Sequence, residues 1–292
     1  MLVNVTMLKS KKTESDVFFA THPVFTAKEF ASFLAMRSGV SVVNAEARQT
    51  LLRHHLKRQK IVRIRRGLYA SVPAGQNPSA YPVDPYLIAA HLTEDSVLAY
   101  HTALSLHGIA QSLREETVSL SIETAASSFP FRGILYRTLP PPTALPTQEA
   151  LTLGIETMDR QGTCVRITAL ERTLVDVFDR LTLSGGWEEV WRSLEGLNLF
   201  LNFDLILRYV GLLKNATTAA KVGFFLNSRR EQLRVPTAVL EALKHQSPKQ
   251  PHYVERRRRR DARLVAEWNL LIPTNLKAIP LPKEGAAEDI PL

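Results

Sequence analysis

The segment of residues 44–71, NAEARQTLLRHHLKRQKIVRIRRGLYAS, most constrains the fold, because its periodicity changes from helical to extended within a few residues. Asn44 is a favourable N-cap, and Glu46 in the first turn complements the helix dipole. The predicted helix buries three leucines that recur at helical spacing, Leu51, Leu52 and Leu56. The first half of the segment therefore predicts an amphipathic helix.

The second half of the segment predicts a β-hairpin. After Gln59, apolar and basic side chains alternate with a period of two, in the order Val62, Arg63, Ile64 and Arg65. Gly67 can supply the turn, and residues 68–70 return as the second strand. A helix followed directly by such a two-stranded wing is typical of a winged helix-turn-helix, which we place at residues 1–75.

Basic and hydrogen-bonding side chains cover the outward side of this predicted unit, which suits duplex DNA as a partner. On the helix, we expect Thr50 on this outward side, and three residues to contact base edges: Gln49, Arg53 and His54. We expect phosphate contacts from the rest of the helix and from the wing: Lys57, Arg58, Arg63, Arg65 and Arg66. His54 and His55 are adjacent, so at most one of them can face DNA.

The positive charge of the chain is concentrated rather than spread. Residues 1–85 hold 13 Lys and Arg against 5 Asp and Glu, a balance of +8 out of a formal net charge of +9. A localised basic unit is the electrostatic footprint of a polyanion binder, because each neutralised phosphate releases a counterion. The alternative, a charge that only aids solubility, would be distributed along the chain.

A linker and a larger second domain are predicted after the wing. Residues 72–85 are rich in proline, so we place a linker at 76–85 and a second domain at 86–292. We expect helices over 85–92 and 96–107, strands over 118–122 and 133–139, and a hairpin with strands 152–158 and 163–167. Two capping boxes, at 26–29 and at 168–171, each predict a helix start. Three or four further helices follow between 186 and 246, and 268–272 resembles a strand. The predicted fold class is α+β, and the tail from Pro280 is expected to fray.

The sequence contains no recognisable catalytic or metal-binding motif. It has no glycine-rich phosphate loop, nucleophile elbow or zinc-protease motif. His101 and His107 are six residues apart, so we expect them at a helix surface or interface rather than on a metal. Asp176 and Asp179 lie beside arginines, and we expect ion pairs on a helix surface there. We therefore expect no enzyme activity, no metal and no cofactor.

Cysteine use and hydropathy favour a cytoplasmic protein. The single cysteine, Cys164, cannot form an internal disulfide and is expected in the core of a strand. No apolar run is long enough for a transmembrane helix, and the N-terminal charges follow the apolar part, which is the wrong order for a secretory signal. We expect no membrane partner.

A run of five arginines near the C-terminus is a possible second basic patch: Arg256, Arg257, Arg258, Arg259 and Arg260. Five adjacent arginines cannot all pair internally, so most are expected to be solvated. The run is either a contact for nucleic acid or an acidic partner, or simply an exposed loop.

Three motifs in order resemble the AbiEi family of antitoxins from type IV toxin–antitoxin systems associated with abortive infection. They are RIRRGLYAS, then SVLAYHTALSLHGIA, then VRITALERTLVDVFDR followed by SGGWEEV. The resemblance covers most of residues 15–200. It implies that an N-terminal winged helix binds inverted repeats in the promoter of its own operon and represses it. It also implies that the C-terminal domain neutralises a nucleotidyltransferase-like toxin, without a direct complex being assumed.

Two other functional classes stay open. The first is a ligand-sensing winged-helix regulator without a toxin partner, whose second domain binds a small molecule. The second is a nuclease or other enzyme that uses the winged domain for targeting, with Asp176 and Asp179 as the acids to test.

Overall fold

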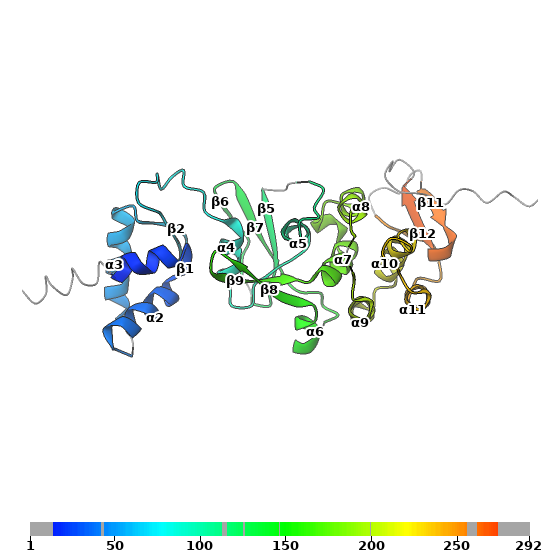
Figure 1. Ribbon diagram of the computed structural model, residues 1–292, viewed down its shortest axis with the longest axis horizontal. Helices are drawn as coiled ribbons and strands as arrows, with labels where there is room; N and C mark the ends of the chain where they lie inside the picture. Colours follow the sequence, from blue (N-terminus) through cyan, green and yellow to red (C-terminus); the bar gives the residue numbers. More distant parts are fainter. Residues whose placement is uncertain are drawn as a thin grey trace, which may run out of the picture.

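The computed structural model describes residues 14–41, 44–112, 116–124, 126–145, 147–198, 200–255 and 262–273. The arginine run Arg256–Arg260 and the tail from Pro280 lie outside these described residues. Figure 1 shows a winged unit, a central sheet and a helical region following one another along the long axis. The chain is thus an α+β protein, as the sequence predicts.

The N-terminal unit combines helices with a small antiparallel sheet. A helix over residues 14–21 precedes the other elements of this unit: β1 (Val24–Thr26), α2 (Ala27–Ser38), α3 (Ala45–Lys57), β2 (Ile61–Arg65) and β3 (Leu68–Ser71). The strand order is β1-β3-β2, with both pairings antiparallel. Thr26 and Glu29 form the capping box predicted for α2, and Gly39 ends that helix in the left-handed region. An aromatic core of Phe18, Phe19, Phe25 and Phe30 lies between these elements.

A six-stranded mixed sheet forms the centre of the molecule. Its elements are α4 (Pro85–Ala90), β4 (Val97–Leu98), α5 (His101–Leu106), β5 (Thr117–Ser121), β6 (Phe129–Phe131), β7 (Ile134–Leu139), α6 (Gln148–Thr152), β8 (Ile155–Arg160) and β9 (Thr163–Thr168). The strand order is β6-β7-β5-β4-β9-β8, in which the β5–β7 and β4–β9 pairs are parallel and the others antiparallel. The predicted hairpin of β8 and β9 is confirmed, with Gln161 and Gly162 in the turn at positive φ.

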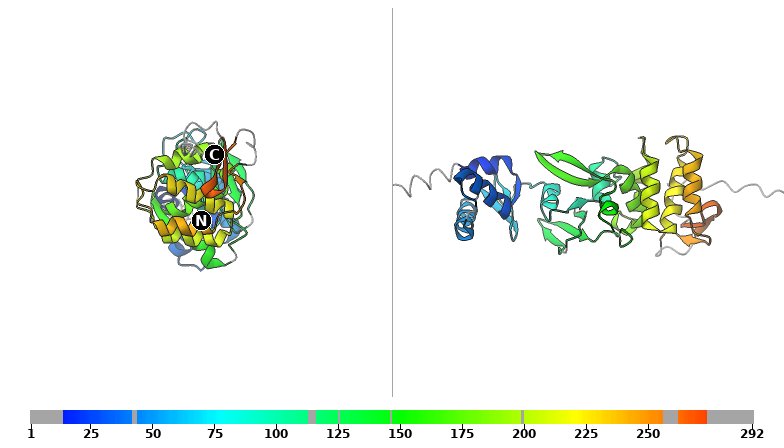
Figure 2. Two further views of the ribbon diagram at one scale, coloured as in Figure 1. Left: turned by 90° about the vertical axis from the view of Figure 1, so that its right-hand side faces the viewer. Right: turned by 90° about the horizontal axis from the view of Figure 1, so that it is seen from below.

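The C-terminal region is helical and carries a second small sheet. Its elements are α7 (Leu170–Asp179), η1 (Leu181–Leu183), α8 (Trp187–Glu195), α9 (Phe203–Leu213), α10 (Ala216–Ser228), α11 (Thr237–His245), β10 (His252–Tyr253), β11 (Ala262–Val265), η2 (Ala266–Trp268) and β12 (Leu270–Pro273). The three tryptophans, Trp187, Trp191 and Trp268, lie in one large apolar core within these helices. The right-hand view in Figure 2 shows that this region stacks on the central sheet at the end opposite the winged unit.

Several local predictions were wrong. Residues 96–107 are not one helix: β4 comes first, and α5 begins only after Tyr100, whose φ of 58° and ψ of −133° break the helical path. The second capping box does not form, because the Thr168 hydroxyl bonds the Thr173 hydroxyl at 2.7 Å and α7 has no side-chain cap. Cys164 lies on strand β9 as predicted, but its side chain is exposed rather than in the core.

Candidate nucleic-acid interface

Helix α3 is fixed in the N-terminal unit by its cap and by one buried side. The Asn44 side chain accepts a hydrogen bond from the Glu46 amide at 2.8 Å, which confirms the predicted N-cap. The buried side consists of Leu52 and His55, whereas the other two leucines of the predicted apolar side are only partly buried. The His55 ring contacts the Phe19 ring edge-on at a centroid distance of 4.8 Å. Packing against Phe19 therefore accompanies the burial of His55, a residue that hydrophobic spacing alone would predict to be exposed.

The opposite side of α3 presents the residues expected to contact DNA. His54 is half-buried, and five of these side chains are exposed: Gln49, Thr50, Arg53, Lys57 and Arg58. None of the five forms a hydrogen bond or ion pair through its side chain with another described residue. The net effect is a solvated basic face on the helix that follows the turn, which is the element a winged helix-turn-helix places in the major groove.

The wing divides its three arginines between solvent and protein. Arg63 and Arg66 are exposed, and Arg66 stands next to Gly67, which turns the hairpin at a φ of 83°. Arg65 instead is half-buried, and its guanidinium carbon lies 5.2 Å from the ring centroid of Phe129 on β6. The sequence alternation suggested equal roles for these arginines, but the structure turns Arg65 toward the central sheet.

The winged unit and the central sheet share one apolar cluster. It joins Val24, Ile64, Leu68 and Ala70 of the small sheet to residues of α4 and of the central strands. Two exposed or half-exposed polar contacts lie nearby, Lys28 to Glu94 at 2.7 Å and His91 to Glu29 at 3.6 Å. The orientation of the wing relative to the second domain is thus set by packing rather than by a free linker.

Two arginines of the central sheet hold the proline-rich segment that was expected to be a linker. The Arg132 guanidinium donates to the backbone carbonyls of Pro78 and Tyr81. Arg160 pairs with Asp84 at 2.6 Å and lies 4.6 Å over the ring of Tyr86. Sequence reasoning missed both residues, because each contact spans more than fifty positions and leaves no local pattern.

Two separate polar contacts join the sequence motifs of the second domain. His101 of α5 lies 3.2 Å from the Glu189 carboxylate of α8, and His107 bonds the carbonyl of Thr168 at 2.8 Å. The expectation that these histidines occupy a helix surface or interface is therefore met by two interfaces. Residues 101–107 thus contact both the end of β9 and helix α8, which are separate from them in the sequence.

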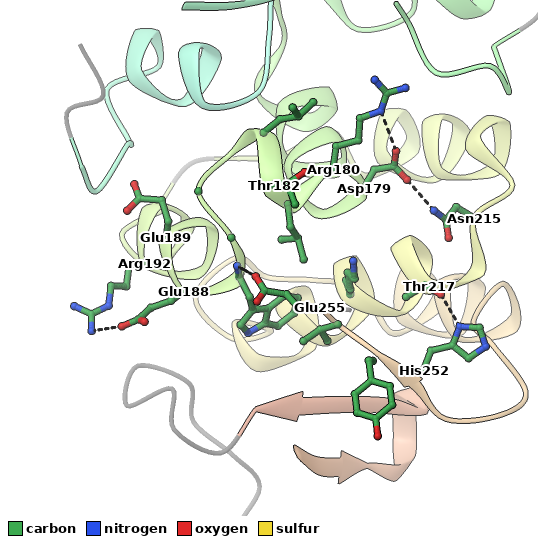
Figure 3. Close-up of a pocket in the computed structure, with 18 of the residues that line it drawn as sticks. Asp179, Arg180, Thr182, Glu188, Glu189, Arg192, Asn215, Thr217, His252 and Glu255 are labelled. Atoms are coloured by element: carbon green, nitrogen blue, oxygen red, sulfur yellow. Dashed lines mark hydrogen bonds and ion pairs between the residues drawn. The ribbon is translucent and has the colours of Figure 1, made fainter. Parts of the chain in front are cut away.

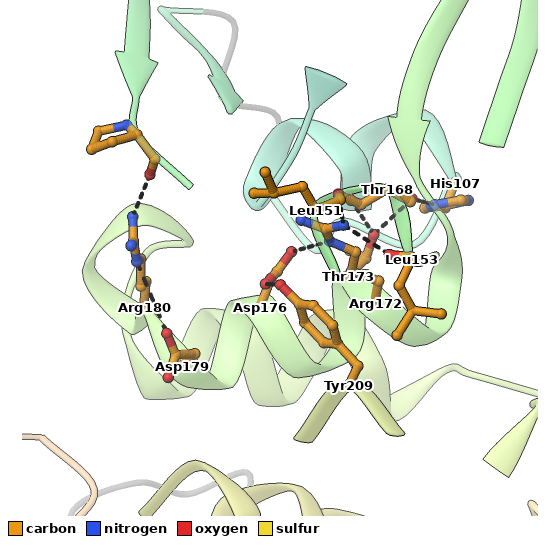
Figure 4. Close-up of polar contacts among 11 residues, drawn as sticks. His107, Leu151, Leu153, Thr168, Arg172, Thr173, Asp176, Asp179, Arg180 and Tyr209 are labelled. Atoms are coloured by element: carbon orange, nitrogen blue, oxygen red, sulfur yellow. Dashed lines mark hydrogen bonds and ion pairs between the residues drawn. The ribbon is translucent and has the colours of Figure 1, made fainter. Parts of the chain in front are cut away.

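The charged residues of α7 correct the prediction of surface ion pairs, as Figure 4 shows. Asp176 is buried, accepts a hydrogen bond from the Tyr209 hydroxyl at 2.7 Å, and lies 3.5 Å from Arg172. Arg172 is buried too, and donates to the carbonyls of Leu151 and Leu153. Burial raises the pKa of the Asp176 carboxyl, although Arg172 and Tyr209 oppose this. Glu171, assigned to the cap, instead accepts from the amide of Asn202.

The described part of the chain shows no cluster of three or more histidine, cysteine, aspartate or glutamate residues that could hold a metal ion. Asp179 is engaged by Asn215 and Thr218 at 2.9 and 2.8 Å. The two acids tested for a nuclease are therefore already bonded to protein donors.

Among the described helices, none combines the length and the apolar composition that a bilayer span requires.

The fold is similar to that in the crystal structure of the RV2827C protein from Mycobacterium tuberculosis. The superposition has a TM-score of 0.55 at 16% sequence identity, and it covers 85% of this chain and 86% of that chain. At this identity the likeness shows a shared fold over most of both chains. No protein-family model and no curated protein matches the sequence.

Proposed function

We propose that this protein is a DNA-binding transcriptional repressor that acts on inverted repeats in its own promoter. The observation that carries the proposal is the solvated basic face of α3, with Arg53, Lys57 and Arg58 exposed and with Arg63 and Arg66 exposed on the adjacent wing. Four of these side chains, Arg53, Lys57, Arg58 and Arg66, have no protein partner among the described residues. Arg63 donates only to the backbone carbonyl of Arg65, at 3.4 Å, so no acid neutralises its charge and all five remain available to a polyanion.

In the proposed complex, α3 lies in the major groove and the wing follows the backbone. Arg53 can read a guanine through two parallel hydrogen bonds, with Gln49 and His54 beside it. Lys57, Arg58 and the exposed wing arginines neutralise phosphates. Inverted repeats would be occupied by two copies of the chain, one on each half-site.

The same proposal extends to an antitoxin role in a type IV toxin–antitoxin system, and this part rests on the motif resemblance. The contacts of His101 with Glu189 and of His107 with Thr168 support it, because they bring the three motif segments of the second domain together. The functional partner would be a nucleotidyltransferase-like toxin, with no direct complex required. Co-expression with the neighbouring open reading frame tests this role: relief of growth arrest is expected, and persistent arrest would exclude it.

A gel-shift titration on the chain's own upstream region, repeated over a series of salt concentrations, tests DNA binding. We expect Arg53→Ala to reduce the free energy of binding to the specific site by about 1–3 kcal/mol and to relax the base preference. We expect Lys57→Ala to weaken specific and scrambled DNA alike and to reduce the salt slope by about one. Uniform losses on both sequences for both variants would show that α3 does not read bases.

A further inference from the structure

The helical region contains an open cleft that the DNA-binding proposal does not use (Figure 3). Its volume is about 1520 Å³. One wall is formed by the end of α7, by η1 and by the start of α8, and the opposite wall by residues 251–255, with the start of α10 between them. The volume of the cleft exceeds the roughly 300–1,000 Å³ of ordinary small-molecule sites. The cleft therefore has room for a ligand with a body as well as a charged group.

The carboxylates that line the cleft are already engaged by protein donors. Glu188 pairs with Arg192 at 2.8 Å, and Asp179 accepts hydrogen bonds from Asn215 and Thr218. Glu189 accepts from the Ser112 amide at 3.0 Å and lies beside His101. The Glu255 carboxylate accepts from the Trp187 amide at the start of α8. Each of these acids thus has at least one protein donor.

Lys221 on α10, in contrast to these acids, has no partner of opposite charge in the part of the chain that the structure describes. Its side chain is buried, with only 7% of the residue exposed, yet it lines the cleft. Its ammonium donates one hydrogen bond, to the carbonyl of Phe178 at 3.1 Å, and no carboxylate of the described residues lies within 4.0 Å of it. An ammonium carries three donors, so two remain without a protein acceptor among the described residues. A buried charge in this state is favourable only when an acceptor arrives.

Arg180, at the end of α7, is a second cation of the lining, and its guanidinium carbon lies 5.9 Å from the ring centroid of Tyr100. It donates to the carbonyl of Pro140 at 3.2 Å and lies 3.9 Å from Asp179, a distance beyond a hydrogen bond. The guanidinium has five N–H donors, so most of its capacity is unused in these contacts. At the other wall, the half-exposed ring of Tyr253 offers an aromatic surface.

We propose that this cleft binds a small organic anion, whose phosphate or carboxylate group accepts hydrogen bonds from Lys221, with Arg180 as a more distant positive charge of the lining. A planar body of the ligand would lie against Tyr253. Burial lowers the pKa of the Lys221 ammonium to about 8 in spite of Asp179 and Glu255, which agrees with a cation that lacks sufficient acceptors. This site is separate from α3 and the wing, so it does not depend on the DNA-binding proposal.

Isothermal titration calorimetry on the full chain tests the site with four probes: inorganic phosphate, phenyl phosphate, benzoate and phenol. We expect phenyl phosphate or benzoate to bind and neutral phenol not to bind, and the comparison of the two anions identifies the preferred group. Lys221→Met should lower the affinity for the anion by about tenfold or more, because a charge-assisted hydrogen bond is lost. Lys244→Met, at an exposed lysine outside the cleft, should leave the affinity unchanged.

Two further variants keep the test decisive if Lys221→Met does not fold. Arg180→Gln should also weaken the binding of phenyl phosphate and of benzoate. Tyr253→Ala should weaken the binding of phenyl phosphate more than that of inorganic phosphate. The proposal is overturned if no anion binds at millimolar concentration, if phenol binds as well as benzoate, or if the folded lysine and arginine variants keep full affinity.

Discussion

Individual arginines of the wing have different environments despite their equal chemistry. Arg66 projects into solvent beside the turn, whereas Arg65 stacks on Phe129 of the central sheet. An arginine that is held on an aromatic face contributes to packing, and one that is solvated can release counterions from DNA. The two positions are therefore natural controls for one another.

We expect Arg66→Ala to weaken binding to any DNA sequence and to reduce the salt slope by about one. Arg65→Ala should leave the slope unchanged and instead lower the free energy of unfolding by about 0.5–1 kcal/mol. Salt-dependent gel shifts and urea unfolding of both variants measure these effects. An equal loss of slope in both variants would place Arg65 on DNA as well.

At the scale of elements, α10 is packed around one glycine. The ring of Trp268 covers Gly223 so closely that a methyl group there would lie 2.1 Å from a ring carbon. Both residues are buried, and the neighbouring core is filled by aromatic side chains. Close approach of η2 to α10 therefore requires a residue without a side chain at this position.

We expect Gly223→Ala to lower the free energy of unfolding by about 1–3 kcal/mol, because the tryptophan must move within a filled core. Gly211 in α9 is the matched control, since the nearest atom to a methyl group added there would be a glutamine oxygen 3.9 Å away. Gly211→Ala should raise the stability by about 0.5–1 kcal/mol through its effect on helix propensity. Urea unfolding midpoints of the two variants should move in opposite directions. A midpoint for Gly223→Ala at or above that of the wild type would contradict the packing argument.

The elements predicted best were those specified by neighbouring residues. The Thr26 capping box, the Asn44 cap and the β8–β9 hairpin all depend on side chains within a few positions of each other. The box at Thr168 has the same residue spacing, but its hydroxyl is used by Thr173 and its acid by Asn202. A distant acceptor or donor can thus override a correct local signal.

At the scale of the whole molecule, apolar packing couples the parts that the sequence presents as separate. One cluster runs from the small sheet into the central sheet, and Arg132 and Arg160 fix the segment between them. The proposed DNA face therefore has a defined orientation relative to the helical region. This coupling could not be read from a proline-rich composition, which by itself suggests a spacer.

The buried Lys221 makes the stability of the whole chain depend on pH. Its folded pKa is about 8 and its ordinary value 10.5, so between these values the unfolded chain binds more protons and stability rises with pH. Burial of the charged Lys221 ammonium lowers the free energy of unfolding by roughly 3 kcal/mol at most, and deprotonation removes this cost. We expect the stability of the wild type relative to Lys221→Met to increase from about pH 8 to about pH 10.5. Chemical denaturation at several pH values measures this difference, and a flat difference would show that Lys221 is not destabilised by burial.

The sequence by itself determined the winged unit and its basic residues, because cap, periodicity and turn are local and charge is additive along the chain. Only the tertiary structure decided which of those residues are free, since Arg65 meets a phenylalanine more than sixty positions away. It also decided that Asp176 is buried and that Lys221 lines a cleft between α7, α10 and residues 251–255. Burial and pairing of a charge depend on long-range packing, and no spacing along one helix records what packs against it.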